Sequence, residues 1–115
     1  MKILKNCIVL SSKVQIYVPT TINIDEPMET SAWVDKAIDL LANQFGGATV
    51  ARRFGAWQEI GKGIVKEDIY LVSAYCDEGK LQAGIEKIYD FCLEMKDQLK
   101  QAAIALEVNN QLYFI

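Results

Sequence analysis

The sequence predicts a single α+β domain in which two β-α-β halves meet at a central hairpin. Two apolar, β-prone runs flank Gly61-Lys62-Gly63, which is the strongest hairpin signal in the chain. A strand-like run and a helical run precede this hairpin, and a helical run and a strand-like run follow it. The order β-α-β-β-α-β, with a possible extra C-terminal strand, is that of a ferredoxin-like two-layer sandwich. We expect one such domain over residues 1–115.

The first strand is expected over residues 7–18, where apolar and polar residues alternate with a period of two. One parity carries the apolar residues of a buried face: Ile8, Leu10, Val14, Ile16 and Val18. The polar pair Ser11-Ser12 suggests an irregular spot within the strand. Pro19 should end the strand, because proline has no N–H to donate to a ladder. Residues 20–28 are then expected to form a polar, acidic loop.

Two amphipathic helices are predicted from apolar residues at helical spacing. The first starts near residue 30, with Thr30 or Ser31 as N-cap, and ends at Gly46-Gly47. The second follows Asp77 and Glu78, whose charge suits a helix N-terminus. Its apolar stripe has spacings of four and three: Leu81, Ile85, Ile88, Cys92, Met95 and Leu99.

The remaining strands are expected over residues 48–59, 64–76, 103–108 and 111–115. In the second strand, Arg53 and Trp57 should face away from the side that carries Val50, Arg52, Phe54 and Ala56. Gly55 within it suggests a bulge or a close backbone approach. The third strand is apolar on both faces from residue 69, which is typical of an interior strand. Asn109-Asn110 predicts a tight terminal hairpin, with one bent strand as the alternative.

Composition excludes several classes of function. The chain has 51% apolar residues, no histidine and a formal charge of −3, so direct nucleic-acid binding is disfavoured. Cys7, Cys76 and Cys92 form no C-x-x-C pair and are expected as buried apolar thiols rather than zinc ligands. We expect no metal and no cofactor. No apolar run is long enough to span a membrane, and a cytoplasmic location is expected.

The central hairpin, G-A-W-Q-E-x-G-K-G-I-V-K-E, resembles a family of small uncharacterised bacterial proteins. In that family a G-x-W strand runs through a turn into a G-[IL]-V-[KR]-E strand, followed by a helix and a terminal β segment. Here the pattern is carried by Gly55, Trp57, Gly63, Val65 and Glu67. The resemblance implies the α+β fold and a setting on mobile elements of Gram-positive bacteria. It implies no activity.

No catalytic residue is expected from the motifs, because the chain lacks a histidine that could activate a serine or cysteine. Glu67 is expected to form an ion pair with an arginine across the hairpin, with a catalytic carboxylate as the alternative. Arg52 and Arg53 lie near Trp57, and arginine and tryptophan are enriched in binding hot spots. These residues are candidates for partner recognition, although aromatic rings can also close the ends of a sandwich.

An acidic stripe is expected along one exposed edge of the second helix: Glu86, Asp90, Glu94 and Asp97. A solvated helix face is one interpretation of this stripe. The other interpretation is a surface that meets a basic protein, such as a nuclease or another DNA-handling enzyme.

Size, acidity and the resemblance together predict a non-enzymatic protein–protein interaction module. Its most concrete form is a small acidic inhibitor or regulator of a nucleic-acid enzyme, of the anti-CRISPR or anti-restriction type. A homodimer built from sheet residues is also expected, because an open apolar sheet leaves an edge or face to be covered. The alternative function is a small-molecule enzyme or ligand-binding domain with a pocket near the hairpin, formed by Arg53, Trp57 and Glu67.

Overall fold

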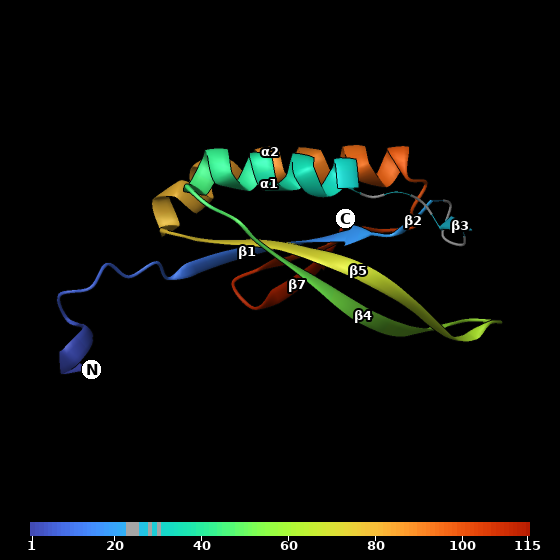
Figure 1. Cartoon of the computed structure of the whole chain (residues 1–115), viewed down its shortest axis with the longest axis horizontal. Helices are drawn as coiled ribbons and strands as arrows, with labels where there is room; N and C mark the ends of the chain where they lie inside the picture. Colours follow the sequence, from blue (N-terminus) through green and yellow to red (C-terminus); the bar gives the residue numbers. More distant parts are fainter. Residues whose placement is uncertain (23–25, 28, 30) are drawn as a thin grey trace.

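The computed structural model describes residues 1–22, 26–27, 29 and 31–115. Its main elements are two α-helices and a five-stranded sheet, with a short 3₁₀ helix at the start (Figure 1). In chain order they are η1 (Lys2–Leu4), β1 (Ser12–Pro19), β2 (Thr21–Ile22), β3 (Glu26–Pro27), α1 (Ser31–Phe45), β4 (Thr49–Glu59), β5 (Gly63–Cys76), α2 (Glu78–Gln98), β6 (Ala105–Val108) and β7 (Gln111–Phe114).

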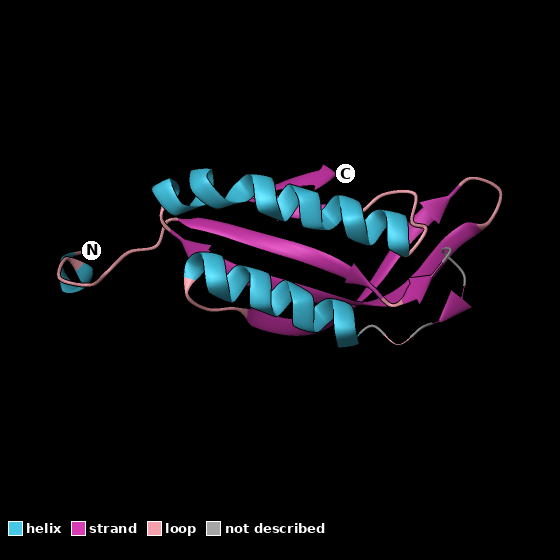
Figure 2. Cartoon of the chain, turned by 90° about the horizontal axis from the view of Figure 1, so that it is seen from above, coloured by secondary structure: helices cyan, strands magenta, loops and turns pink. Residues whose placement is uncertain are grey.

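The strands of the large sheet lie in the order β4-β5-β1-β6-β7, and each neighbouring pair is antiparallel. Both helices lie on the same face of this sheet (Figures 1 and 2). The predicted two-layer α+β sandwich is therefore confirmed. The order of the first four strands, β4-β5-β1-β6, is that of a ferredoxin-like arrangement, and β7 adds the extra C-terminal strand.

The hydrophobic core lies between the helices and the sheet. The side chains of Val14, Ile16 and Val18 on β1 are completely buried, and they share one face because successive strand residues alternate. The helices contribute further buried side chains to this layer: Ala37, Leu41, Phe45, Leu81, Ile88, Cys92 and Met95. The predicted stripe of the second helix thus packs on the sheet, and only Ile85 within it is partly buried.

Turn and cap residues behave as their chemistry predicts. The backbone N–H of Lys80 donates to Asp77 Oδ1 at 2.8 Å, so Asp77 is the N-cap of α2. Asn109 and Asn110 both have positive φ angles, 51° and 69°. Such angles suit a two-residue turn between antiparallel strands. The terminal hairpin is therefore confirmed over the bent strand.

The prediction for the first strand is wrong in its N-terminal part. Pairing begins at Ser12, opposite Cys76, whereas Ile8 is 93% exposed and Leu10 is 46% exposed. Their alternation matches a strand, but residues 7–11 extend beyond the end of β5 and have no strand beside them among the described residues. Cys7 lies in this segment and is exposed, so the expectation of a buried thiol holds only for Cys76 and Cys92.

The connection between β1 and α1 is only partly described. Within the expected loop, β2 and β3 form a two-residue antiparallel ladder. The candidate N-cap Thr30 lies outside the described residues, and the backbone N–H of Ser31 donates to Glu29 Oε1 at 2.9 Å. Among the described helices, none combines the length and the apolar character needed to cross a membrane.

Gly84 provides a test of the helix–helix contact. A Cβ atom at this position would lie 2.9 Å from Gln44 Oε1 and 3.3 Å from a ring carbon of Phe45. Gly84→Leu should therefore lower the free energy of unfolding by about 1–3 kcal/mol, the usual cost of overpacking. Gly79→Leu is the control, because a Cβ there meets only Asp77 Oδ1 at 3.4 Å. Urea denaturation checks this, and equal effects of the two changes would contradict the close contact.

Candidate ligand-binding site

The face of the sheet that the helices leave uncovered carries a second set of side chains. Because strand residues alternate, Tyr17 points away from the buried Ile16 and Val18. The register of the sheet places Ile69 and Glu67 of β5 on the same open face, together with Trp57 of β4. This open face holds the candidate site.

A cavity of about 630 Å³ lies on the open face, between the β4–β5 hairpin and the C-terminal segment. We call it the open-face cavity. Its wall is mainly aromatic and aliphatic, with two carboxylates and one amide. The lining residues are Tyr17, Pro19, Gly55, Ala56, Trp57, Glu59, Glu67, Ile69, Gln101, Ala102, Ala103, Ile104, Ala105, Leu112 and Phe114.

Gly55 leaves room in front of Glu67. The two residues are directly paired across the hairpin, and the register continues through Gly55 without the bulge suggested by the sequence. A Cβ atom at Gly55 would make only ordinary contacts, 3.8 Å to the Glu67 carbonyl oxygen and 3.9 Å to Ile69 Cδ1. Gly55 is therefore required neither by backbone conformation nor by close packing, and its effect is to keep the space beside Glu67 open.

The carboxyl group of Glu67 is in an unfavourable place for a charge. Desolvation by its surroundings raises its pKa, and a hydrogen bond that Oε2 accepts from Thr21 Oγ1 at 3.3 Å opposes the rise. Among the ion pairs formed by the described residues, none involves Glu67. A half-buried carboxylate without a cation beside it can attract a positively charged ligand or exchange a proton with one.

Other groups in the cavity extend these possibilities. Glu59 Oε2 is buried and receives no hydrogen bond from the part of the chain that the structure describes. Trp57, Tyr17 and Phe114 offer aromatic surfaces, which bind cations over their ring faces and stack on flat rings. The cavity can therefore accept a ligand that combines a cationic group with a planar, apolar part.

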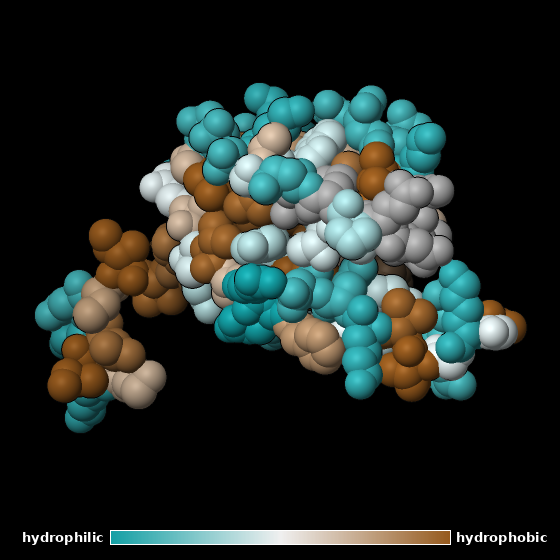
Figure 3. All heavy atoms as spheres, turned by 45° about the vertical axis from the view of Figure 1, so that its right-hand side comes forward, coloured by the Kyte–Doolittle hydropathy of each residue, from teal (hydrophilic) through white to brown (hydrophobic). Residues whose placement is uncertain are grey.

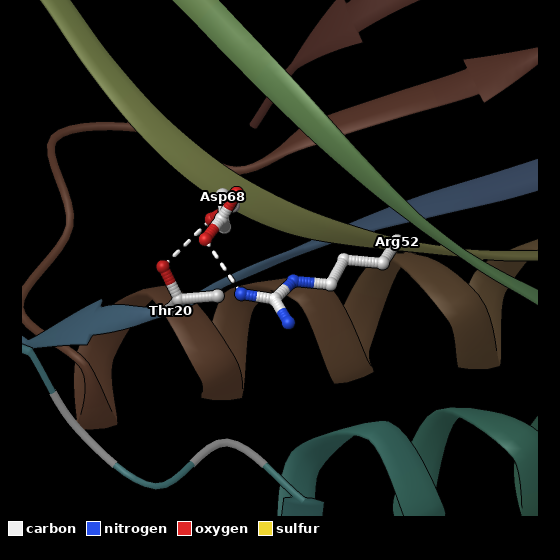
Figure 4. Close-up of polar contacts among 3 residues, drawn as sticks. All are labelled: Thr20, Arg52 and Asp68. Carbon is white, nitrogen blue, oxygen red and sulfur yellow. Dashed lines mark hydrogen bonds and ion pairs between the residues drawn. The ribbon is translucent and has the colours of Figure 1, made fainter.

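The two arginines predicted for recognition do not line this cavity. Arg52 lies on the opposite face of β4, where its Nη2 lies 2.7 Å from Asp68 Oδ2 (Figure 4). The carbonyl oxygen of Asp68 also accepts a hydrogen bond from Thr20 Oγ1 at 2.6 Å. Arg53 is on the open face, but its guanidinium donates to the Arg52 carbonyl oxygen. The expected ion pair of Glu67 with an arginine is therefore wrong, because the residue opposite Glu67 is Gly55.

The acidic stripe lies on another part of the surface. Glu86, Asp90, Glu94 and Asp97 are all exposed on α2, which packs on the other face of the sheet (Figure 2). They cannot contribute to the open-face cavity, and their proposed role in partner binding stays a prediction. Of the predicted site residues, only Trp57 and Glu67 meet in one cavity.

The two buried cysteines are unsuited to nucleophilic chemistry, and no metal centre is found among the described residues. Burial raises the pKa of Cys92 to about 12, and it also raises the pKa of Cys76, with Asp77 and Glu78 adding to the rise. Such thiols stay protonated and are poor nucleophiles. The described part of the chain contains no group of three or more acidic or cysteine side chains placed to hold a metal ion.

Several lining residues were not predicted from the sequence. Tyr17 could have been found, because its parity opposes that of the apolar residues in the same strand. Leu112 and Phe114 reach the cavity only because β7 follows β6 along the sheet, antiparallel to it. Gln101 also lines the cavity, and its amide donates to the carbonyl oxygens of Thr21 and Leu99. No local pattern marks these three as site residues.

The fold and the site together define an α+β sandwich with a mainly apolar cavity on the open face of its sheet. No family model matches the chain, and no curated protein sequence matches it. Two solved structures are similar. A phage SAM lyase in complex with S-methyl-5'-thioadenosine has a TM-score of 0.67 at 14% identity, covering 97% of this chain and 94% of its own. A phage SAM lyase in the apo state has a TM-score of 0.56 at 16% identity, covering 91% and 88%.

These neighbours overturn the functional prediction made from the sequence. Both are structures of an enzyme, and one holds a small molecule. The expectation of a non-enzymatic interaction module that inhibits a nucleic-acid enzyme is contradicted. The expectation that the chain has no enzymatic activity is contradicted as well. The alternative, a small-molecule enzyme or ligand-binding domain with a pocket near the hairpin, is better supported. The error arose because the absence of histidine was taken as the absence of a catalytic site, although the open-face cavity contains two carboxylates.

The raised pKa of Glu67 predicts a pH-dependent effect of Glu67→Gln on stability. A carboxyl group whose pKa is raised by folding contributes stability that is fully present below its unfolded pKa, about 4.3. That contribution is lost as pH rises through the folded pKa. Glutamine cannot ionise, so Glu67→Gln should melt near the wild-type temperature in acid and above it near neutral pH. Thermal unfolding at both pH values checks this; a variant that melts lower near neutral pH would contradict it.

Proposed function

We propose that this chain is an S-adenosylmethionine lyase and that the open-face cavity is its active site. The observation that carries the proposal is Glu67, a half-buried carboxylate without an ion-pair partner among the described residues, facing a cavity with aromatic walls. The similarity to phage SAM lyase extends over nearly the whole chain and supports the same fold. Fold alone does not determine activity, so the argument rests on how the cavity suits this substrate.

The cavity suits S-adenosylmethionine in size and chemistry. Its volume of about 630 Å³ lies within the range of small-molecule sites, roughly 300–1,000 Å³. The substrate consists of a flat adenine, a ribose, a positively charged sulfonium and an amino-acid chain. Trp57 and Phe114 offer surfaces on which adenine can stack, an interaction worth about 1–3 kcal/mol per base. Ile69 and Leu112 provide apolar contacts for the methyl group.

The positive charges of the substrate explain the unpaired carboxylate. S-Adenosylmethionine carries a sulfonium and an ammonium group, and each would be attracted to the Glu67 carboxylate. Bringing a cation within about 4–6 Å of a carboxylate lowers its pKa and offsets the desolvation that raises it in the empty cavity. The aromatic ring of Trp57 or Tyr17 can stabilise the sulfonium further through a cation–π interaction.

The reaction would break the bond between sulfur and the γ carbon of the amino-acid chain. The bond electrons stay on sulfur, which becomes the neutral thioether of S-methyl-5'-thioadenosine. The carbon fragment completes its valence by losing a proton from the β carbon or by attack of its own carboxylate, which closes a lactone. Glu67 would serve as the base in the first route and would hold the ammonium group in the second. Both routes remove the sulfonium charge, which the mainly apolar wall of the cavity favours.

The source of the neighbours also bears on the setting. Both solved structures are of phage proteins. This supports the proposal that the chain belongs to a mobile element, as the resemblance of its hairpin implies.

Turnover should depend on Glu67. Purified protein incubated with S-adenosylmethionine should form S-methyl-5'-thioadenosine, measured by liquid chromatography, and Glu67→Gln should lower kcat/KM by about 100-fold or more, the scale of a lost catalytic carboxylate. Asp68→Asn is the matched control, because the same acid-to-amide change then falls on the opposite face of the sheet. A folded wild-type protein that forms no product, or full activity in Glu67→Gln, would refute the proposal. Lactone or vinylglycine as the second product distinguishes the two routes.

Gly55 should control access to the cavity. Gly55→Val adds a branched side chain beside Glu67, and the strand can accept it because a Cβ there makes only ordinary contacts. Affinity for S-methyl-5'-thioadenosine, measured by calorimetry, should fall at least tenfold while the melting temperature changes little. Ala51→Val is the control, because Ala51 lies on the same face of β4 and does not line the cavity. Unchanged affinity in Gly55→Val would place the ligand elsewhere.

A further inference from the structure

The first eleven residues form an arm that projects from the sandwich. Figure 1 shows it leaving the end of β1, and Figure 3 shows it as a mostly apolar extension on one side of the molecule. Ile3 is 88% exposed and Val9 is 73% exposed, and the arm carries Lys2 and Lys5 but no acidic residue. Contiguous exposed apolar surface of this kind marks a site of interaction.

A groove of matching character lies along the outer side of α2. The two helices do not cover β7, the last strand in the order of the sheet. A cavity of about 590 Å³ lies between α2 and the β6–β7 hairpin. We call it the α2–β7 groove. Its walls are mainly aliphatic and aromatic, and include Ile85, Tyr89 and Leu93 from α2 and Val108, Tyr113 and Ile115 from the terminal hairpin. Lys96 of α2 is the one charged side chain among the described residues that line it. Tyr89, Leu93 and Tyr113 are exposed.

The acidic stripe forms the rim of this groove. Each of its members directly follows a groove residue in the sequence, as Glu86 follows Ile85 and Asp90 follows Tyr89. One residue turns an α-helix by about 100°, so the acids lie beside the groove on its solvent side. The arm is basic and apolar, and the α2–β7 groove is apolar with an acidic rim. The two surfaces are therefore complementary in apolar character and, apart from Lys96 in the groove lining, in charge.

We propose that the arm of one copy of this chain docks in the α2–β7 groove of a second copy. Ser12, where the arm begins, is buried and donates to Glu78 Oε2 at 3.1 Å, so the arm leaves from a fixed point at the start of α2. From there it points away from its own sandwich (Figures 1 and 2). If η1 unwinds, the eleven residues can span about 36 Å, which exceeds the two shorter dimensions of the chain, 26 and 21 Å.

This docking uses a different surface from the homodimer expected from the sequence. That homodimer was expected to form through sheet residues, and it stays a prediction. The apolar side chains of the arm would enter the α2–β7 groove, and Lys2 and Lys5 would lie against the acidic rim. Because every copy carries both an arm and a groove, exchange of arms can be reciprocal and closed. The proposal is independent of the reaction that the open-face cavity performs.

Cross-linking between two tagged forms of the full chain tests the docking directly. Cys7 lies in the arm and is the exposed one of the three cysteines, so a bismaleimide reacts there first. One form keeps Cys7, and the other, of different mass, carries Cys7→Ser with Leu93→Cys in its groove. We expect a covalent pair of the two forms on a denaturing gel. With Phe54→Cys, which is exposed on β4, in place of Leu93→Cys, the pair should be absent.

A single chain carrying both Cys7 and Leu93→Cys separates the two ways in which an arm could dock. A cross-link confined to one chain at low concentration would mean that the arm binds its own groove, and it would overturn the proposal. Equal cross-linking to Leu93→Cys and Phe54→Cys would show undirected collisions and would also overturn it.

Charge exchange provides the second test. Light scattering of the wild type should give a mass above the 12.9 kDa of one chain, and Ile3→Ser with Ile8→Ser and Val9→Ser should weaken association at least tenfold. For the charge exchange, Glu86→Lys with Asp90→Lys should also weaken the association. Adding Lys2→Glu with Lys5→Glu to that variant should restore the association. A wild type that stays monomeric at micromolar concentration, or serine variants that associate like the wild type, would refute the docking. Association that the reversed charges neither weaken nor restore would refute the ionic part.

Discussion

Burial of one face of the sheet beneath two helices is the constraint on which the rest of the structure depends. Val14, Ile16 and Val18 on β1 are completely buried there, and each such side chain contributes roughly 1.5–3 kcal/mol. A slip of one residue in the pairing of β1 would turn all three to the other face. The register is therefore fixed by the core. The same register determines which residues point to the open face, so the candidate site is set by packing on the opposite side of the sheet.

The open face accepts features that a core could not. Glu67 has a desolvated carboxyl with a raised pKa, so its charge works against folding near neutral pH. Its neighbour across the hairpin is a glycine, which contributes no side chain to the sheet. Proteins commonly retain such unfavourable groups where function needs them, and they lose stability in consequence. The ion pair of Arg52 with Asp68 on the other face adds little in return, because both side chains are exposed.

Periodicity predicted the architecture because the core is built from it. The stripe of α2 and the alternation in β1 each place apolar residues on one side. Because apolar sides are buried against each other, the helices and the sheet form two layers. The same rule failed at Ile8 and Leu10, because alternation shows that a segment can pair but not that a strand lies beside it. For Glu67, the sequence located the residue but not its partner. A register shift of two positions would place Arg53 instead of Gly55 opposite Glu67, and no local pattern fixes that register. Leu112 and Phe114 join the site only through the order of strands in the sheet, which no local pattern contains.

The low sequence identity to the two similar structures has the same cause, because the core face of the sheet determines the fold and the open face carries the candidate site. A sandwich of this type needs apolar residues at alternate strand positions and along two helix stripes, and many residue types satisfy that need. Fourteen per cent identity is therefore compatible with a TM-score of 0.67 over nearly the whole chain. The open face is under no such requirement, so its side chains are free to define a reaction. Three features of the open face are costly or neutral for folding: the partly desolvated carboxylate of Glu67, the space left by Gly55 and the ring of Trp57. Such residues give the firmest basis for assigning chemistry, because the stability of the fold does not explain their presence.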